Sequence, residues 1–339
     1  MKRVTIRDVA DGAGVSYQTV SRVLNHRPDV ADDTRQRVNQ VIQELGYQPS
    51  AIARGLVTRR THLLGLVTID YEDNFYAGVC NGVQDEAHAH GYMLIIVSTC
   101  REQSLEVGYI QQLLRHGVDG IVVVRDTILR SDAAVSSLVD AGVPLVLACF
   151  RRPNEHYTLV DIDNEDGGRQ VARHLLKKGH RQAAMITAPS SYEVTHKRIR
   201  GFLSVYQEAG LSLDPELIVE GDWHFDGGYR AAQALVSSGR PFTAVFAHND
   251  SMAIGAQRAF REAGLRIPQD ISLVGYDDLP VSGQLDPPLT SVWQPRHETG
   301  AEAVHLLLAQ INEKQATRTD SIHLKPKLVE RGTVQRCLL

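Results

Sequence analysis

The chain has 339 residues, of which 43% are hydrophobic, so more than one domain and a sizeable core are expected. It opens on charged residues, without an apolar run of signal-peptide type, and no stretch reaches transmembrane length. These features predict a cytoplasmic protein with no membrane partner. Its four cysteines lie far apart without a C-x-x-C pair, so we expect free thiols and no disulfides.

Charge is unevenly distributed along the chain. Residues 1–60 hold ten Lys or Arg and six Asp or Glu, a balance of +4, whereas the whole chain has a formal net charge of −4. Residues 61–339 therefore carry −8. A basic segment ahead of an acidic body is what contacts with phosphate groups require, so the distribution indicates a nucleic-acid partner for the first 60 residues.

Three short helical patterns follow one another in this basic segment. Thr5 and Asp8 have the T-x-x-D spacing of a helix start. Gly14 stands where a tight turn between two helices requires a small residue or a positive φ, and Ser16 is suited to cap the second helix. A third helix is predicted from Thr34 to Gly46, with apolar residues at i, i+3, i+4 and i+7: Val38, Val41, Ile42 and Leu45.

The second helix, in the run VSYQTVSRVLN (15–25), gathers its polar residues on one side. At about 100° per residue, five polar side chains fall within an arc of roughly 140°: Tyr17, Gln18, Ser21, Arg22 and Asn25. Val20, Val23 and Leu24 lie opposite and can dock on a small core. Arg and Gln can present paired hydrogen bonds to base edges in a major groove, although a solvated amphipathic face explains this stretch equally well. The flanking helices favour DNA reading, because the three together make a helix-turn-helix module.

Short apolar strands alternate with amphipathic helices from residue 62 onward. A first series of buried parallel strands is predicted at LLGLVTI (63–69), YMLIIVS (92–98), DGIVVV (119–124) and PLVLAC (144–149). A second series follows at AAMITA (183–188), ELIVEG (216–221), TAVFA (243–247) and ISLVGY (271–276). Two successive runs of strand–helix units predict two α/β lobes of similar build.

Several of these blocks resemble the LacI/GalR family of bacterial repressors. The runs TIRDVADGAGVSYQTVSRVLN, TRQRV, ELGYQPSAIARGL and VGYDD are typical of that family, occur in its order and span nearly the whole chain. The run VSYQTVSRV (15–23) is similar to the recognition region of the family's lac-type member. The resemblance implies an all-α helix-turn-helix head and a two-lobe α/β body of the periplasmic-binding-protein type, with a ligand cleft between the lobes.

The resemblance also implies a domain organisation. A helix-turn-helix DNA-binding domain is expected over residues 1–48, a hinge helix or linker over 49–61, and a two-lobe effector-binding and dimerisation domain over 62–339. The chain is expected to cross between the lobes near residues 161, 290 and 321. Lobe 1 then comprises about residues 62–161 and 291–320, and lobe 2 about residues 162–290 and 321–339.

The linker carries two further candidate contacts with DNA. Residues 51–57 are short for an isolated helix, which is marginal in water below about a dozen residues, and Gly55 lowers the propensity by a further ~1 kcal/mol relative to Ala. We expect this helix to form only when DNA and a second copy support it. Leu56 is predicted to wedge into a minor-groove base step, with packing inside the linker as the alternative. The predicted DNA-binding residues are Thr5, Ser16, Tyr17, Gln18, Thr19, Ser21, Arg22, Asn25, Ala53 and Leu56.

A small molecule is expected in the crevice at the carboxyl ends of the body's strands. Trp223, Asn249 and Asp277 each follow a predicted strand, and Arg198 matches the arginine that precedes GF in the family. An Asp accepts from two vicinal hydroxyls, Arg donates a fork of N–H groups, and an indole covers the apolar side of a sugar ring. This set suits a polyol, with helix capping as the alternative role for Asn249.

Three positions depart from the family's lac-type member. Cys149 aligns with a sugar-binding aspartate, Arg125 with an asparagine, and Arg296 with an aromatic residue that packs on the sugar. Because a buried unpaired cation is costly, either these arginines pair with protein acids or the ligand supplies a negative or oxygen-rich group. An acidic or phosphorylated sugar is the sharper hypothesis within a sugar effector. The predicted effector-binding residues are Phe75, Tyr76, Arg125, Cys149, Arg198, Trp223, Asn249, Asp277 and Arg296.

Enzymatic motifs are missing from the sequence. It contains no G-x-S-x-G, H-E-x-x-H, Walker-type or G-x-G-x-x-G run. His88 and His90 are two residues apart on a predicted helix and point to different sides, so we expect no metal pair. The chain is therefore predicted to be neither an enzyme nor a cofactor-binding protein.

The resulting prediction is a ligand-responsive repressor, most simply of sugar-utilisation genes. Two heads are expected to read the halves of a near-palindromic, double-stranded operator. After LVERGTVQR (328–336), which resembles the family's last strand, no heptad tail remains to build a tetramer, so a homodimer is expected. Whether the effector releases the operator or promotes its binding stays open. The alternative is a sugar-binding protein without a regulatory DNA role, which a gel shift at low and high salt distinguishes.

Overall fold

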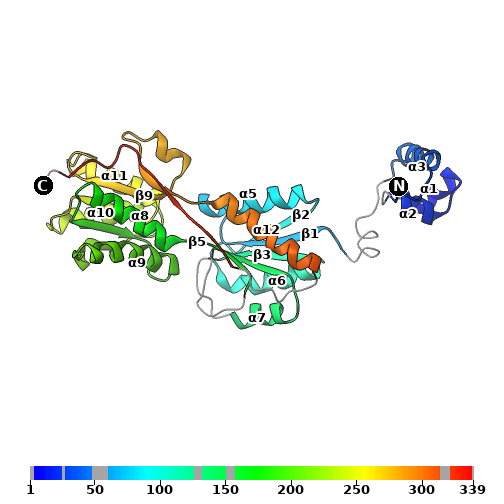
Figure 1. Cartoon of the computed structure of the whole chain (residues 1–339), viewed down its shortest axis with the longest axis horizontal. Coiled ribbons are helices and arrows are strands. Elements are labelled where there is room, and N and C mark those ends of the chain that lie inside the picture. Colours follow the sequence, from blue (N-terminus) through cyan, green and yellow to red (C-terminus); the bar gives the residue numbers. More distant parts are fainter. Residues whose placement is uncertain are drawn as a thin grey trace. The chain divides into compact units, whose positions relative to one another are not determined.

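The computed structural model describes residues 4–24, 27–47, 60–125, 132–149, 157–313 and 321–337. The chain divides into two units, Met1–His62 and Leu63–Leu339 (Figure 1). In the part of the chain that is described, no helix combines the length and the apolar character needed to span a bilayer.

The N-terminal unit consists of three helices, α1 (Ile6–Ala13), α2 (Tyr17–Leu24) and α3 (Asp32–Leu45). The predicted start of α1 is confirmed, since the Thr5 hydroxyl accepts from the Asp8 N–H and the Asp8 carboxylate accepts from the Thr5 N–H at 2.7 Å. Gly14 ends α1 in the left-handed region, at φ 64°, where glycine has no Cβ penalty. The Ser16 hydroxyl caps α2 by accepting from the Thr19 N–H at 3.1 Å.

The apolar sides of the three helices form one small core. It comprises Val9, Ala10, Ala13, Val20, Val23, Val30 and Val38. The third helix begins at Asp32, two residues before the predicted Thr34, and Gly46 ends it. Leu45 was predicted on the apolar side but is 40% exposed. The residue of α1 that faces it is Gly12, which has no side chain to cover it.

The second unit contains two six-stranded sheets, each in its own lobe. The order is β11-β5-β4-β3-β1-β2 in lobe 1 and β12-β10-β9-β8-β6-β7 in lobe 2. Strand pairs are parallel except that β12 runs antiparallel to β10. The lobe 1 strands are β1 (Leu63–Thr68), β2 (Met93–Ser98), β3 (Gly120–Val124), β4 (Leu145–Ala148), β5 (Leu159–Ile162) and β11 (Ser321–Leu324). The lobe 2 strands are β6 (Ala183–Thr187), β7 (Ile218–Glu220), β8 (Ala244–Ala247), β9 (Ser272–Asp277), β10 (Thr290–Trp293) and β12 (Lys327–Val329).

Helices cover both faces of each sheet (Figure 1). In lobe 1, α5 and α12 pack on one face, and α6 and α7 on the other. In lobe 2, α10 and α11 cover one face, and α8 and α9 the other. Their bounds are α5 (Asn74–Ala89), α6 (Glu106–Arg115), α7 (Asp132–Asp140), α8 (Asn164–Lys177), α9 (Glu193–Glu208), α10 (Phe225–Ser237), α11 (Asp250–Glu262) and α12 (Arg296–Glu313). Burial on both faces explains why the central strands are almost entirely apolar.

All eight predicted strands are present, with ends that differ by no more than one or two residues. Strands β5, β10, β11 and β12 were not predicted from apolar runs, because polar residues interrupt each of them: Asp161 in β5, Thr290 and Ser291 in β10, His323 in β11 and Lys327 in β12. The final strand expected within residues 328–336 is confined to Lys327–Val329.

The chain crosses between the lobes three times, after β5, after β10 and after β11. Thr290–Trp293 pairs with β9 and therefore belongs to lobe 2, whereas Ser321–Leu324 pairs with β5 and belongs to lobe 1. The crossings expected near residues 161, 290 and 321 therefore come one to three residues later, after Ile162, Trp293 and Leu324. Strands β10 and β11 stay paired with their neighbours up to their last residues, so the chain crosses to the other lobe only after each strand has ended.

Candidate functional site

The polar side of α2 is open to solvent in the N-terminal unit. Tyr17 is 55% exposed, and Gln18 and Arg22 are also exposed. Ser21, on the same side, is half-buried. Arg22 makes an ion pair with Asp29 at 3.6 Å in which both side chains are more than half exposed. Such a pair is worth little, so the guanidinium can exchange it for another partner.

Thr5, Ser16 and Thr19 lie at helix N-termini. The hydroxyls of Thr5 and Ser16 cap α1 and α2, and Thr19 Oγ1 lies 3.0 Å from Ser16 Oγ. N–H groups at a helix N-terminus attract phosphate, so these residues suit backbone contacts better than base contacts. The predicted contacts Asn25, Ala53 and Leu56 lie outside the described residues, and their roles stay predictions.

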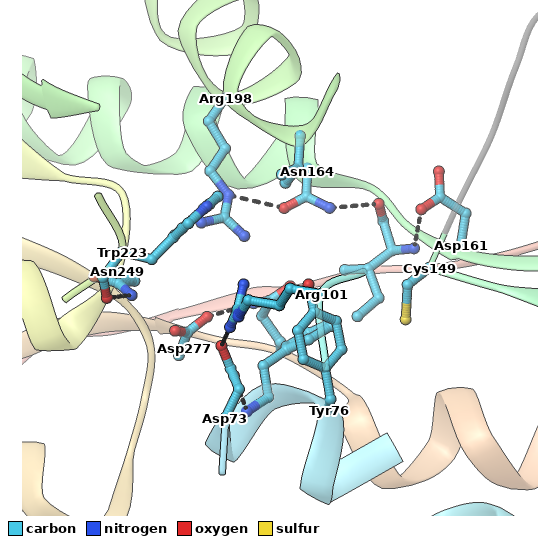
Figure 2. A pocket seen from close by; sticks show the side chains of 14 residues that line it. Asp73, Tyr76, Arg101, Cys149, Asp161, Asn164, Arg198, Trp223, Asn249 and Asp277 are labelled. Carbon is cyan, nitrogen blue, oxygen red and sulfur yellow. Dashed lines mark hydrogen bonds and ion pairs between the residues drawn. The ribbon is translucent and has the colours of Figure 1, made fainter. Parts of the chain in front are cut away.

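A cavity lies between the two lobes of the second unit (Figure 2). Its empty space of about 570 Å³ is partly open to solvent. Seven of the nine predicted effector-binding residues line it: Phe75, Tyr76, Cys149, Arg198, Trp223, Asn249 and Asp277. The other lining residues are Asp73, Arg101, Asp161, Ile162, Asn164, Val194 and Gln294.

Arg198, on α9, organises the lobe 2 side of the cavity. Its side chain is 3% exposed and its Nε donates to Asn164 Oδ1 at 2.9 Å. The Nη1 group donates to the carbonyl oxygen of His248. The guanidinium carbon lies 3.6 Å from the centre of the Tyr276 ring, a cation–π contact. These contacts fix the plane of the guanidinium, which points into the cavity (Figure 2).

Asp277 and Gln294 form a buried pair across from Arg198. Gln294 Nε2 donates to Asp277 Oδ1 at 2.6 Å. Burial raises the pKa of Asp277 to about 7, against the opposing effect of the positive charge on Arg198. Gln294 is 1% exposed, and its Oε1 has no hydrogen-bond partner among the described residues. A buried acceptor without a donor is costly, so this oxygen is suited to accept a hydrogen bond from a ligand.

Ionisation of Asp277 should reduce folding stability. A carboxyl whose pKa is raised by folding stabilises the fold below its ordinary pKa of 3.8, and that contribution is lost as the pH rises through about 7. The shift corresponds to about 4 kcal/mol. We expect Asp277→Asn to flatten the fall in unfolding free energy across this window and to be more stable than wild type at about pH 8. Urea denaturation at a series of pH values measures this.

A matched control for that experiment is Asp85→Asn, since Asp85 has a side chain that is 68% exposed. Asp250 should retain part of the pH dependence, because burial raises its pKa to about 6. An unchanged profile in Asp277→Asn would contradict the assignment.

The lobe 1 side of the cavity contains a group of charged residues, one arginine and two aspartates, that was not predicted from the sequence. Arg101 donates from Nε to Asp70 Oδ2 and from Nη2 to Asp73 Oδ2, both at 3.1 Å. Asp73 also caps α5 through the Phe75 N–H at 2.8 Å. Phe75 and Tyr76 pack edge to face, with ring centres 5.4 Å apart. The signal that points to Asp73 is its position as a capping residue just before a predicted helix, whereas nothing in the sequence marks Arg101.

Asn249 uses its amide to position Trp223. Its Oδ1 accepts from the Met252 N–H at 2.8 Å and caps α11, and its Nδ2 donates to the Trp223 carbonyl at 2.8 Å. The alternative role weighed for Asn249, helix capping, is therefore present. The Trp223 indole packs edge to face on Tyr192, with ring centres 5.6 Å apart, and forms an aromatic wall of the cavity.

The two arginines predicted to reach the ligand do not line the cavity. Arg125 is 2% exposed, and its Nε lies 2.9 and 3.1 Å from the two carboxylate oxygens of Glu106. It has therefore taken the first of the two alternatives, pairing with a protein acid. Arg296 begins α12 and donates to the carbonyl of Asn74 at 3.4 Å. In this arrangement both arginines have partners on other elements of the fold, and their contact with a ligand stays a prediction.

Four lining residues have left-handed backbones. The φ angles are 66° at Arg101, 68° at Cys149, 73° at Trp223 and 109° at Asp277. Residues other than glycine adopt this region at a cost of about 1 kcal/mol or more, and such positions concentrate at ligand sites. Their presence on both sides of the cavity supports a binding role for it.

Comparisons with known proteins match both units of the chain. Residues 5–50 match the family model described as bacterial regulatory proteins, lacI family, and residues 172–334 match a periplasmic binding protein-like domain. The HTH-type transcriptional repressor PurR of Edwardsiella ictaluri (strain 93-146) is 38% identical over 332 residues, which cover 97% of this chain and 96% of that protein.

Two solved structures match over 98% of this chain and 100% of their own. The Lac repressor dimer bound to operator and the anti-inducer ONPF has a TM-score of 0.88 at 30% identity. The complex of the transcriptional regulator CelR with cellobiose has a TM-score of 0.72 at 34% identity. Likeness along nearly the whole length, with both units matched, shows that this chain belongs to the LacI family of bacterial regulatory proteins.

Proposed function

We propose that this DNA-binding regulator is a dimeric repressor whose affinity for its operator is set by a neutral, hydroxyl-rich ligand in the cavity between the lobes. Its relatives are transcriptional repressors, in agreement with the prediction that the chain is not an enzyme. The Lac repressor in the comparison is a dimer on its operator, which supports the same assembly here. The exposed polar side of α2 supplies the base-reading groups.

Removing the Arg22 side chain should relax operator recognition. Arg22→Ala should weaken operator binding by about 1–3 kcal/mol and lower the preference for one guanine. Arg258→Ala is the matched control, because its side chain is 73% exposed on α11, in the second unit. Fluorescence anisotropy with operator and with random DNA measures both quantities.

Selection from random DNA adds a second readout. Since Tyr17, Gln18 and Arg22 have the residue types of the family's lac-type member, the selected half-site should resemble that of the lac operator. An unrelated half-site, or an unchanged base preference in Arg22→Ala, would contradict the assignment.

The ligand class follows from how the groups in the cavity are paired. Arg198 offers guanidinium donors, and the Asp277 carboxyl and Gln294 Oε1 offer acceptors. This arrangement of donors and acceptors between aromatic rings is the observation that carries the proposal, because a polyol ring both donates and accepts and has an apolar face.

Apart from Arg198, which faces Asp277, the charged side chains of the cavity are paired within the protein, and this favours a neutral, oxygen-rich ligand. Arg101 is bound to two aspartates, and Asp161 is bound to Lys197 at 2.7 Å. The hypothesis of an acidic or phosphorylated sugar depended on Arg125 and Arg296, which do not line the cavity. A neutral sugar therefore fits better, as cellobiose does in the CelR complex.

Calorimetry with neutral sugars, the matching sugar phosphates and nucleosides tests the ligand class. Operator anisotropy with and without the best ligand then gives the sign of the response, because an effector acts only through its different affinities for the two states. Tighter binding of phosphates or nucleosides would refute the neutral sugar. Sugar binding without salt-sensitive binding to DNA would favour the alternative, a sugar-binding protein with no regulatory DNA role.

A further inference from the structure

Three metal-ligating side chains meet on lobe 1, outside the residues that line the cavity. Glu86 lies in the last turn of α5, His90 directly follows that helix, and His305 lies midway along α12. Each offers one ligand atom, and these atoms lie within 4.8 Å of one another. His88 is not part of this group. The second imidazole comes instead from a helix more than 200 residues further along the chain.

The Glu86 carboxylate is the common point of the cluster. Its Oε1 lies 2.7 Å from His305 Nε2 and 3.1 Å from His90 Nδ1. Ligand atoms about 2.0–2.2 Å from a tetrahedral zinc ion lie roughly 3.4 Å from one another. The two distances of 2.7 and 3.1 Å are close to this value, so small side-chain rotations, in which His90 Nδ1 also leaves the Glu86 carbonyl oxygen at 3.0 Å, would let the three atoms hold an ion. All three side chains are partly exposed, so an ion can enter from solvent.

Glu302 faces the other nitrogen of the His305 ring. Its Oε2 lies 3.6 Å from His305 Nδ1, one turn back along α12. Metal-bound histidines commonly give their second ring N–H to a carboxylate, which fixes the tautomer and orients the ring. In this arrangement Nε2 of His305 is the ligand nitrogen, and it is the atom that points to Glu86.

We propose that Glu86, His90 and His305 bind a divalent transition-metal ion that ties α5 to α12. Two imidazoles and one carboxylate suit zinc, nickel or copper rather than calcium or magnesium, which prefer oxygen ligands. Three protein ligands leave a fourth position for water. Both helices also begin beside the cavity, since α5 carries Phe75 in its first turn and α12 starts two residues after Gln294.

Zinc calorimetry and cobalt absorption spectra test this site on the full chain. Wild type should bind one ion. His305→Ala and Glu86→Gln should each lower the affinity for this ion by at least about tenfold. Glu302→Gln should lower it by about tenfold, because the His305 ring is then no longer oriented. Excess zinc should raise the Tm of wild type by a few degrees and leave that of His305→Ala unchanged. Tetrahedral cobalt bands should appear in wild type and be lost in both ligand variants.

His297→Ala is the matched control. It removes another exposed histidine of α12, whose Nε2 pairs with Asp85 at 3.0 Å; among the described residues this pair belongs to no group of three possible metal ligands. The chain holds 14 histidines, and others among them can bind zinc weakly. The test is therefore the difference in zinc affinity between His305→Ala and His297→Ala, and not zinc binding by itself. Equal zinc affinity in wild type and His305→Ala, or equal losses in His305→Ala and His297→Ala, would overturn the site.

Discussion

Arg198→Ala should abolish the response of operator binding to the effector and leave operator binding itself intact. The substitution removes the donor fork that faces Asp277 and releases Asn164, which Arg198 orients at 2.9 Å. Two charge-assisted hydrogen bonds are worth about 3 kcal/mol or more, so effector affinity should fall by at least about 100-fold. Anisotropy of a labelled operator, titrated with effector, measures both quantities in one experiment.

Three further variants sharpen this test. Arg200→Ala removes an arginine two residues away whose side chain is 52% exposed, and it should respond normally. Arg198→Lys keeps the charge but not the planar fork, so it should still fail to respond. Asp277→Asn, which removes the acceptor opposite, should also lose the response. A normal response in both Arg198→Ala and Asp277→Asn would mean that the effector binds elsewhere.

Glu106→Ala should destabilise the second unit by about 3–5 kcal/mol, because it removes the carboxylate from a buried ion pair. The side chains of Arg125 and Glu106 are 2% and 6% exposed, so the charge left behind has little access to water. Urea denaturation measures the loss. Glu102→Ala is the control in the same region, since Glu102 is exposed and its hydrogen bonds go to Ser104.

A double variant separates a structural Arg125 from a ligand-binding one. Replacing the pair by Arg125→Met and Glu106→Leu should recover much of the lost stability, because apolar side chains of similar size pack where the ions were. It should also keep effector affinity, since Arg125 does not line the cavity. A large loss of effector affinity in the folded double variant would restore Arg125 as a ligand contact.

Local signals account for what the sequence predicted of the fold. Capping at Thr5 and Ser16 and the turn at Gly14 depend on neighbours within a few residues, and each is present as expected. The eight buried strands were visible as apolar runs. By contrast β11, an edge strand with alternating exposure, has no such run, and its place beside β5 depends on pairing across more than 150 residues.

In the cavity too, residues marked by the local sequence were predictable, whereas residues held by distant partners were not. Trp223, Asn249 and Asp277 follow strands, and the carboxyl ends of parallel strands meet at one edge, so their convergence was predictable. Arg101 belongs to the cavity because two aspartates from another loop hold it there. Arg125 does not line the cavity, because its guanidinium is paired with Glu106 on α6. A single sequence shows charged residues but does not show which of them are partners in the fold.

The three crossings between the lobes have a mechanical consequence. Two bodies joined by three short tethers have little freedom to separate or to slide, whereas small φ and ψ changes in the tethers allow them to rotate. The relative motion of the lobes is then mainly a rotation, which one angle describes. A ligand that touches Arg198 on one lobe and Arg101 on the other acts as a spacer that selects this angle by its dimensions. Two sugars that differ by one ring can bind with similar strength and still select different angles, so affinity and regulatory effect are separable properties of a ligand.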